Sequence, residues 1–209
     1  MLVDLTVKEF LNKVAGSDPV PGGGSIAALN GAIASALAAM VANLTVGKKG
    51  YEAHEELMQH IAGVALQEKD TFIEDIDRDS EAYDSVFACF KMPKATDEEK
   101  AARSAAIQKG LEGCTATPFE MMELSLEALR LTGGLVDRSN ASAASDLGCA
   151  ALHLGSAVQG AWLNVLINLG SIRDAAFAAQ YRTRGQILLD EALPLAQSIY
   201  ARVLKAVQG

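Results

Sequence analysis

The acidic residues between positions 70 and 90 include one that breaks the pattern of the others. At the 3.6-residue period of a helix, most of them fall on one face, which we expect to be solvated. Asp79 falls instead in the middle of the opposite, apolar face, with Asp75 at its edge. A carboxylate that faces a core resists ionisation, which raises its pKa toward the range useful for proton transfer. Spacing leaves two interpretations open, an acid–base group or a buried structural aspartate that caps a neighbouring helix. The apolar face carries Phe72, Ile76, Tyr83, Val86, Phe87 and Phe90, and the acidic face carries Asp70, Glu74, Asp77, Glu81 and Asp84.

A second group of polar side chains follows one face of the apolar segment 141–169. Hydrogen-bonding residues stand at both ends of this row and small residues in the middle, which is typical of a groove wall rather than of a packed ridge. Buried amides must be satisfied, so either partner helices or a polar ligand meets Asn164 and Asn168. The row consists of Asp146, Ala150, His153, Ala157, Gly160, Asn164 and Asn168.

The third candidate is the glycine run Gly22, Gly23 and Gly24, which ends in Ser25 and leads into an alanine-rich helix. Free N–H groups at a helix start suit an anion or a carbonyl oxygen, although a plain flexible turn explains the run as well. The run is not a P-loop, because GxxxxGK[ST] is absent. Ser25 shares a face of the following helix with Asn43.

No metal site is expected from the sequence. The stretch DIDRD resembles the start of a calcium-binding EF-hand loop, but Ser80 and Val86 stand where glycine and glutamate are needed. His54 and His60 are six residues apart and do not share a helix face. The three cysteines are widely spaced and odd in number, and they are interpreted as reduced thiols of a cytoplasmic protein.

These side chains need helices to position them, and helix signals run through the whole chain. Half of the residues are hydrophobic but only 5% are aromatic, a bias that suits closely packed helices better than sheets. We expect an all-α bundle of six or seven long helices in a single domain, residues 1–209. Capping boxes predict helix starts after Thr6, Thr96 and Thr117, the last with Pro118 in the first helical position. Further helices are expected over about 25–46, up to about 90, over about 141–169, and over about 174–207 with a bend at Pro194.

Charge and hydropathy exclude several classes of function. The formal net charge is −8 and no basic run exceeds Lys48-Lys49, so nucleic-acid binding is not expected. The N-terminus lacks the pattern of a signal peptide. Segments 26–46 and 147–172 carry no charge over a membrane width, yet their small residues and amides favour burial in a core or subunit interface over a membrane.

Three segments together resemble the cyclodeaminase/cyclohydrolase family of folate enzymes, to which formiminotransferase-cyclodeaminase and methenyltetrahydrofolate cyclohydrolase belong. They are PVPGGGSIAALNGAIASALAAMVANLT, DRDSEAYDSVFACFKMPKATDEEKAARSAAIQ and SDLGCAALHLGSAVQGAWLNVLINLGSIRD, in that order. The resemblance runs from about Leu5 to past Phe177, and the chain has the length of that module alone.

The resemblance implies an all-α homodimer or higher homo-oligomer that joins through long helices, with a folate cleft near the subunit interface. It places the glycine run with Ser25, then Asp77 and Asp79, then Asp146, Asn164 and Asn168 around the site. Periodicity favours Asp79 over Asp77. One of Asp79 and Asp146 would transfer the proton and the other would stabilise cationic charge, while the two asparagines bind the pterin edge. Lys48 and Lys49 could meet the glutamate carboxylates of the substrate, and a solvated turn is the alternative.

The leading hypothesis is formimidoyltetrahydrofolate cyclodeaminase, which converts 5-formimidoyltetrahydrofolate into 5,10-methenyltetrahydrofolate and ammonia. The alternative is methenyltetrahydrofolate cyclohydrolase, which hydrolyses 5,10-methenyltetrahydrofolate to 10-formyltetrahydrofolate. Neither reaction requires a metal, nucleotide or redox cofactor. A non-catalytic helical dimer that binds folate is the alternative from a different class, and the buried aspartates argue against it.

Overall fold

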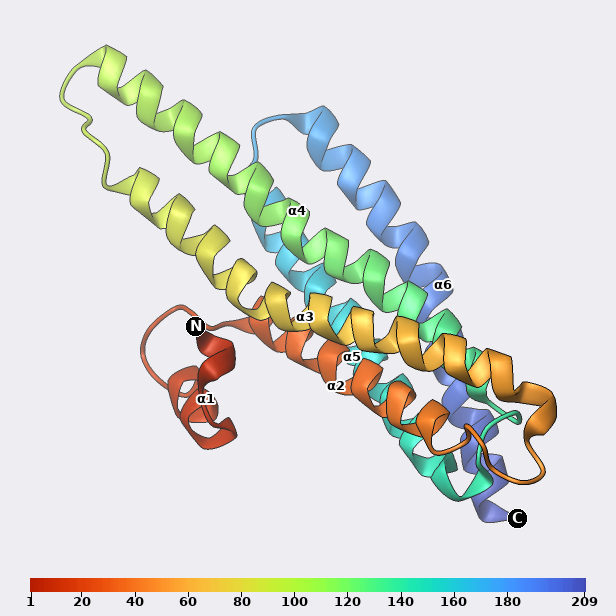
Figure 1. Cartoon of the computed structure of the whole chain (residues 1–209). Helices are drawn as coiled ribbons and strands as arrows, with labels where there is room; N and C mark the ends of the chain where they lie inside the picture. Colours follow the sequence, from red (N-terminus) through yellow and green to blue (C-terminus); the bar gives the residue numbers. More distant parts are fainter.

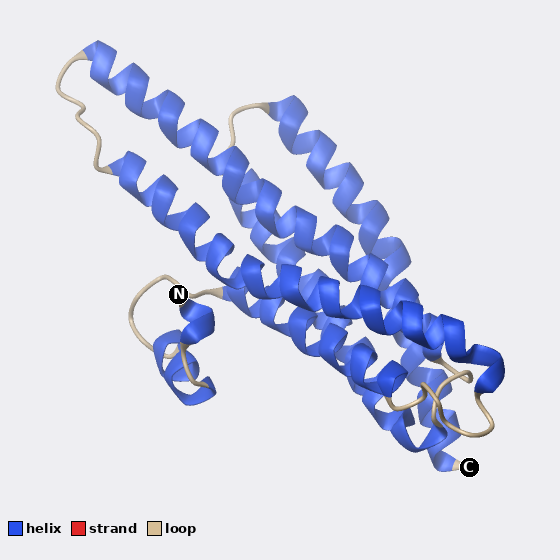
Figure 2. Cartoon of the chain, in the orientation of Figure 1, coloured by secondary structure: helices blue, strands red, loops and turns tan.

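The computed structural model describes all 209 residues, and every regular element in it is a helix (Figure 2). The expected all-α class is confirmed. Five of the six α-helices are long, and the first has only eight residues. The α-helices are α1 (Val7–Val14), α2 (Gly23–Asn43), α3 (Glu55–Phe90), α4 (Asp97–Leu135), α5 (Ala144–Leu169) and α6 (Ala175–Gln208), and 3-10 turns lie at Leu2–Asp4, Glu52–His54 and Ala141–Ala143.

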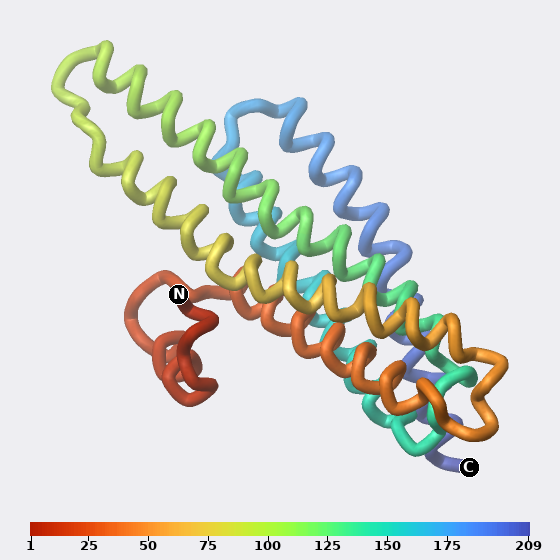
Figure 3. The backbone as a smooth tube through the Cα atoms, viewed as in Figure 1, coloured from red at the N-terminus to blue at the C-terminus, as the bar shows by residue number.

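The five long helices lie side by side in a bundle, with α1 apart from them near the N-terminus (Figure 1). α2 packs against both α3 and α5, and α4 packs against α3, α5 and α6. Small residues on α2 allow these close approaches: a side chain at Gly31 would overlap the buried ring of Phe72 on α3. The tube in Figure 3 shows the N-terminal segment looping back toward the start of α2.

Two of the three capping boxes form as the sequence predicts. Thr6 and Thr96 each accept a hydrogen bond from the N–H of the glutamate three residues later, and each glutamate accepts one from the threonine N–H. These bonds satisfy two of the N–H groups that a helix start leaves free.

The third predicted helix start is wrong, because α4 continues without a break through Thr117 and Pro118. Proline has no N–H, so the carbonyl of Cys114, four residues earlier, loses its helical donor. The side-chain amide of Asn168 on α5 donates to that carbonyl at 2.7 Å instead. A tertiary hydrogen bond therefore replaces the one that Pro118 removes, and α4 passes through the proline.

Two helical stretches, Gly23–Asn43 and Ala141–Leu169, are long and apolar enough to cross a membrane on length and composition alone. Core helices of soluble bundles pass the same test, and the apolar window of α2 is 61% buried against its neighbours. The corresponding window on α5 is only 44% buried. One side of α5 thus remains apolar and uncovered within this chain.

Glu68 on α3 is a charged residue that the fold buries without a compensating partner. Its side chain is 7% exposed, and its Oε2 atom has no hydrogen-bond partner. Burial, together with the nearby carboxylate of Glu127, raises the pKa of Glu68 to about 7. Because the folded pKa lies above the unfolded one, ionising Glu68 destabilises the fold as the pH rises from about 4.5 to about 7.

The Glu68→Gln variant should therefore unfold less readily than the parent at pH 8 and about equally at pH 4.5. We expect a gain of about 1–2 kcal/mol at pH 8, after allowance for solvent screening of the carboxylate. Urea unfolding at the two pH values measures it. The variant Glu127→Gln, which removes only the exposed neighbour, should yield a smaller gain. A Glu68→Gln protein less stable than the parent at pH 8 would contradict the assignment.

Candidate functional site

A cavity of about 320 Å³ lies at the end of the bundle where α2 begins and α5 ends. It brings together the glycine run, Asp79 and both asparagines, which come from three separate segments of the sequence. The structure thus places these predicted site residues around one space. The cavity is lined by Pro19, Val20, Gly22, Gly23, Gly24, Asp79, Ala82, Tyr83, Cys114, Asn164, Ile167, Asn168 and Ser171.

Asp79 is the only carboxylate that lines this cavity. The hydroxyl of Ser25, itself fully buried, lies 3.1 Å from Asp79 Oδ2 and 2.9 Å from the carbonyl oxygen of Ile76. A hydroxyl has one proton, so Ser25 can donate to the Ile76 carbonyl while its oxygen accepts from a protonated Asp79, or it can donate to the ionised carboxylate. Ser25 therefore accommodates both protonation states of Asp79.

Burial raises the pKa of Asp79, and hydrogen bonds from the Ser25 side chain and backbone partly oppose the rise. The direction agrees with the expectation from its place on the apolar face of α3. The neighbouring Cys114 thiol has its pKa raised to about 11 by burial and by the Asp79 charge. Because the thiolate is the nucleophilic form, Cys114 stays a neutral wall of the cavity.

The glycines serve the site by leaving space for side chains on other helices. A side chain at Gly24 would overlap the carboxyl group of Asp79, and a Cβ at Gly23 would lie 3.2 Å from Asn164 Nδ2. A flexible turn, one of the two interpretations of the glycine run, does not explain why Gly23 and Gly24 lie so close to side chains on other helices. The backbone of α2 must begin against the Asp79 carboxylate, and only glycine permits that approach.

The two asparagines use their amide nitrogens inside the protein. Asn164 Nδ2 donates to the Gly160 carbonyl at 2.8 Å, and Asn168 Nδ2 donates to the Cys114 carbonyl at 2.7 Å. Their side-chain carbonyl oxygens are thereby left as hydrogen-bond acceptors at the cavity. Asn168 also links α5 to α4, because the Cys114 carbonyl that it binds has no helical donor at Pro118.

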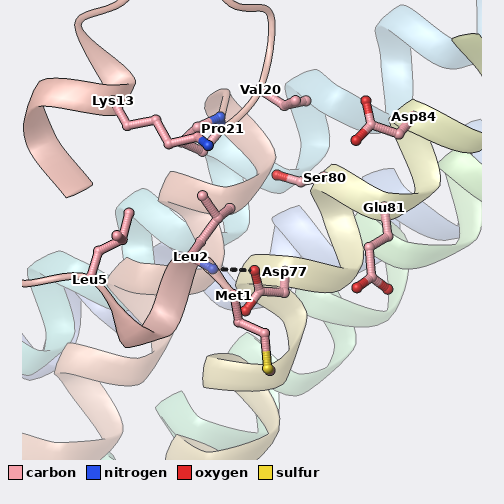
Figure 4. Close-up of a pocket in the computed structure, with 10 residues that line it drawn as sticks. All are labelled: Met1, Leu2, Leu5, Lys13, Val20, Pro21, Asp77, Ser80, Glu81 and Asp84. Atoms are coloured by element: carbon pink, nitrogen blue, oxygen red, sulfur yellow. Dashed lines mark hydrogen bonds between the residues drawn. The ribbon is translucent and has the colours of Figure 1, made fainter. Parts of the chain in front are cut away.

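Asp77 lies outside this cavity and holds the N-terminus (Figure 4). Its Oδ1 accepts a 2.6 Å hydrogen bond from the Leu2 N–H, and the side chain belongs to a separate cavity of about 290 Å³. The expectation that Asp77 is solvated is wrong, because the N-terminal segment packs over it and leaves it 8% exposed. Asp75 pairs with Arg78 at 3.2 Å, a structural role.

The remaining predicted site residues lie at the opposite end of the bundle. Asp146 precedes Asn164 on α5 by 18 residues, which at 1.5 Å per residue is about 27 Å. Asn43 ends α2, about 30 Å from Gly23 by the same measure. Lys48 and Lys49 follow in an exposed turn. Long straight helices separate residues that share a helix face, so within one chain Asp146, Asn43 and these lysines do not join the Asp79 cavity.

Seven of the thirteen lining residues were not among the predicted site residues, and Cys114 and Tyr83 are two of them. Cys114 was interpreted only as a reduced thiol, and Tyr83 only as part of an apolar face. The signal for Cys114 was Pro118, because a proline inside a helix frees the carbonyl four residues earlier for a tertiary contact. No group of three His, Cys, Asp or Glu side chains lies close enough together to hold a metal ion.

Comparisons with known proteins all lead to folate enzymes. The family model described as formiminotransferase-cyclodeaminase matches residues 6–186. A methenyltetrahydrofolate cyclohydrolase of Methylorubrum extorquens is 37% identical over 202 residues, which cover 97% of either chain. A formimidoyltransferase-cyclodeaminase of Sus scrofa is 34% identical over 97% of this chain, which spans 37% of that relative's length. A crystal structure of a formiminotetrahydrofolate cyclodeaminase from Thermotoga maritima superposes with a TM-score of 0.81 at 30% identity, over 100% of this chain and 98% of that one.

The bond between Asn168 and the Cys114 carbonyl yields a prediction on stability. Asn168→Ala should cost about 1–3 kcal/mol, because it leaves that carbonyl without a donor. In a Pro118→Ala background the helix regains its own N–H donor, so the same substitution should cost less than half as much. Urea unfolding of the four proteins measures this coupling.

Asn164→Ala is the matched control, because its amide bonds only to a carbonyl of its own helix. Its cost should not depend on residue 118. Equal costs of Asn168→Ala in the two backgrounds would show that Asn168 does not compensate for the proline.

Proposed function

Since the chain belongs to the formiminotransferase-cyclodeaminase family, we propose that it hydrolyses 5,10-methenyltetrahydrofolate to 10-formyltetrahydrofolate at the Asp79 cavity. It is an enzyme of folate one-carbon metabolism. The choice of hydrolysis rests on the cyclohydrolase that is 37% identical over nearly the whole of both chains. The single structural observation that carries the assignment is one partly buried carboxyl group, with a raised pKa, facing the cavity.

Hydrolysis of the methenyl bridge needs one proton removed and another delivered. Water attacks the amidinium carbon and loses a proton, which produces a tetrahedral carbon bonded to N5, N10 and oxygen. The bond from that carbon to N5 then breaks as N5 gains a proton, and the remaining hydroxyl loses its proton to solvent as the formyl carbonyl forms. The net change is the uptake of one water and the release of one proton.

In the proposed mechanism Asp79 carries out both proton transfers in turn. The cationic amidinium favours the ionised form of a carboxylate beside it, so Asp79 can accept the proton of the attacking water in the complex. The same negative charge stabilises the cationic substrate. Asp79, then protonated, supplies the proton to N5, while Ser25 holds the carboxyl group in place in either state. The hypothesis of a second carboxylate, Asp146, is not needed within one chain.

The side-chain carbonyls of Asn164 and Asn168 complete the proposed site. A pterin ring presents N–H groups along its edge, and these acceptors at the cavity wall suit them. The start of α2, which lies against Asn164, supplies backbone N–H groups to the same cavity. We propose no metal, nucleotide or redox cofactor for the reaction.

The second candidate is the reaction that the sequence favoured, cyclodeamination of 5-formimidoyltetrahydrofolate. The solved relative from Thermotoga maritima, similar over the full chain, supports it. That reaction passes through the same kind of tetrahedral carbon, with an amino nitrogen in place of the water oxygen. Asp79 would then take the proton from N10 and deliver one to the departing ammonia.

One absorbance assay distinguishes hydrolysis, cyclodeamination and folate binding without activity. A fall of the methenyltetrahydrofolate band, faster than in buffer alone, is expected and would establish hydrolysis. A rise of that band from 5-formimidoyltetrahydrofolate, with ammonia released, would establish cyclodeamination. Binding of folate with neither activity would leave the folate-binding helical dimer as the answer and overturn the proposed function.

We propose a homodimer or higher homo-oligomer in the cytoplasm as the form that acts. Apolar side chains of α2 and α5 remain exposed in a single chain, and Leu163 and Ile167 are 67% and 74% exposed. A second copy would cover such a face. Light scattering should report a multiple of the chain mass of 21.9 kDa, and a monomer would contradict this assembly.

The Asp79→Asn variant should lower kcat by about two to four orders of magnitude, because an amide can neither accept nor supply the proton. Binding of a tetrahydrofolate derivative, measured by calorimetry, should persist. Asp146→Asn is the matched control and should retain near-normal turnover in the absorbance assay. Comparable losses in the two variants would contradict the single-carboxylate mechanism.

The Ser25→Ala variant should move the pH profile of kcat/KM to higher pH. Hydrolysis needs the ionised Asp79, so the rate falls as the pH drops through the pKa of that carboxyl. The Ser25 hydroxyl stabilises the ionised form, and its removal raises the pKa of Asp79 further. Stopped-flow rates across the pH range measure the acidic limb. An unmoved limb would mean that Asp79 is not the group that titrates.

A further inference from the structure

A row of exposed aromatic side chains leads away from the Asp79 cavity along α3. Tyr83 lines the cavity and is 40% exposed, and its ring stacks on that of Phe87 with 6.2 Å between centroids and 13° between planes. Phe87 is 47% exposed. The sequence predicted both rings on the apolar, buried face of this helix. Their exposure is therefore a departure that calls for a physical reason.

The reason is that α3 and α4 extend beyond the other helices at this end, as Figure 1 shows. Past residue 82 the apolar face of α3 is covered only in part. Val86 is buried where a side chain at Gly110 on α4 would touch it, and Arg103 of α4 lies 5.7 Å from the centroid of the Phe90 ring, whereas Tyr83 and Phe87 remain exposed. Stacked aromatic rings left in water lose the benefit of burial. Their position next to the Asp79 cavity suits a planar ligand that would cover them.

Positive charge lies at the far end of the same row. Lys91 Nζ lies 4.7 Å from the centroid of the Phe87 ring. Residues 91–109 hold five basic and three acidic side chains, although the whole chain has a net charge of −8. The nearby acidic residues Glu81 and Asp84 line the separate cavity over Asp77, on a different side of α3 (Figure 4). The row thus offers a local attraction for anions.

Resting on the proposed function, we propose that Tyr83, Phe87 and Lys91 bind the tail of the folate substrate, its aminobenzoyl ring and its glutamate carboxylates. In these folates the ring is bonded directly to N10, next to the reacting carbon, and the glutamates follow through an amide. Asp79, Tyr83, Phe87 and Lys91 follow one another at four-residue intervals, about 6 Å apart along the helix. Along the helix, the Asp79 carboxylate is followed by the aromatic pair and then by the lysine. Along the substrate, the reacting carbon is followed by the aminobenzoyl ring and then by the glutamate carboxylates, so the two orders match.

The test compares substrates with one and with five glutamates in the absorbance assay, for the parent and three variants. Lys91→Glu should raise KM for the pentaglutamate about three- to tenfold, with a smaller rise for the monoglutamate and little change in kcat. Phe87→Ala should raise KM for both substrates about two- to tenfold, and Phe87→Tyr should restore the parent value. Lys205→Glu makes the same change of charge at an exposed lysine at the other end of the protein and is the charge-matched control.

Ionic strength supplies an independent readout. Salt that shortens the Debye length from about 10 Å to about 3 Å should remove most of the preference for the pentaglutamate in the parent and change little in Lys91→Glu. Calorimetric binding of unreactive tetrahydrofolate mono- and pentaglutamates should follow the same pattern without any turnover.

Two outcomes would overturn the inference while leaving the proposed function in place. One is normal turnover with equal KM values for both glutamate lengths and no response to Lys91→Glu. The other is loss of the oligomer in Phe87→Ala, seen by light scattering, which would assign the aromatic row to a subunit interface. Absence of turnover in the parent would instead overturn the proposed function, and equal calorimetric affinities for the two glutamate lengths would then overturn the inference as well.

Discussion

The close approach of the start of α2 to the Asp79 carboxyl group is the constraint on which the site depends. Gly24 leaves no room for a side chain there, and Ser25, the next residue, is buried against the same carboxyl group. A larger residue at position 24 would separate α2 from α3 and expose Asp79 to water. The pKa of Asp79 is raised because burial disfavours its ionised form. The close packing of α2 against α3 therefore also determines how readily Asp79 holds a proton.

The part of the cavity wall formed by α4 and α5 depends on a hydrogen-bond donor that α4 lacks. Pro118 deprives the Cys114 carbonyl of its helical hydrogen bond, and Asn168 supplies another from α5. An unsatisfied buried carbonyl costs free energy, so this pairing also sets how α4 and α5 meet beside Asp79. The side-chain nitrogen of Asn168 is therefore used within the protein, and its side-chain carbonyl oxygen remains available to a ligand.

A single carboxyl group in the cavity is enough for the chemistry proposed for this chain. Both candidate reactions need a proton taken from one atom and returned to another on the same tetrahedral carbon. A group that receives the proton first and delivers it next can serve both, provided that its two protonation states are close in energy. Burial and the Ser25 hydroxyl act in opposite directions on that balance. Under the proposed mechanism, the choice between water and nitrogen would depend on what else enters the cavity, rather than on a different catalytic group.

The sequence by itself determined the helical class, two of the three capping boxes, and the places of Asp79, the glycine run, Asn164 and Asn168. The helices and the face that Asp79 occupies follow from local periodicity, whereas the grouping of these residues around one site followed from the family resemblance. Local rules hold wherever the neighbouring helices agree with them. Only the tertiary structure decided the rest. It buried Asp77 under the N-terminal segment, carried α4 through Pro118, and left Tyr83 and Phe87 exposed. It also placed Asp146 and Asn43 at the far end of the bundle, because residues on one helix face can still be many turns apart. Periodicity specifies which face a residue occupies, whereas position along the helix and the identity of the covering segment depend on how the helices pack.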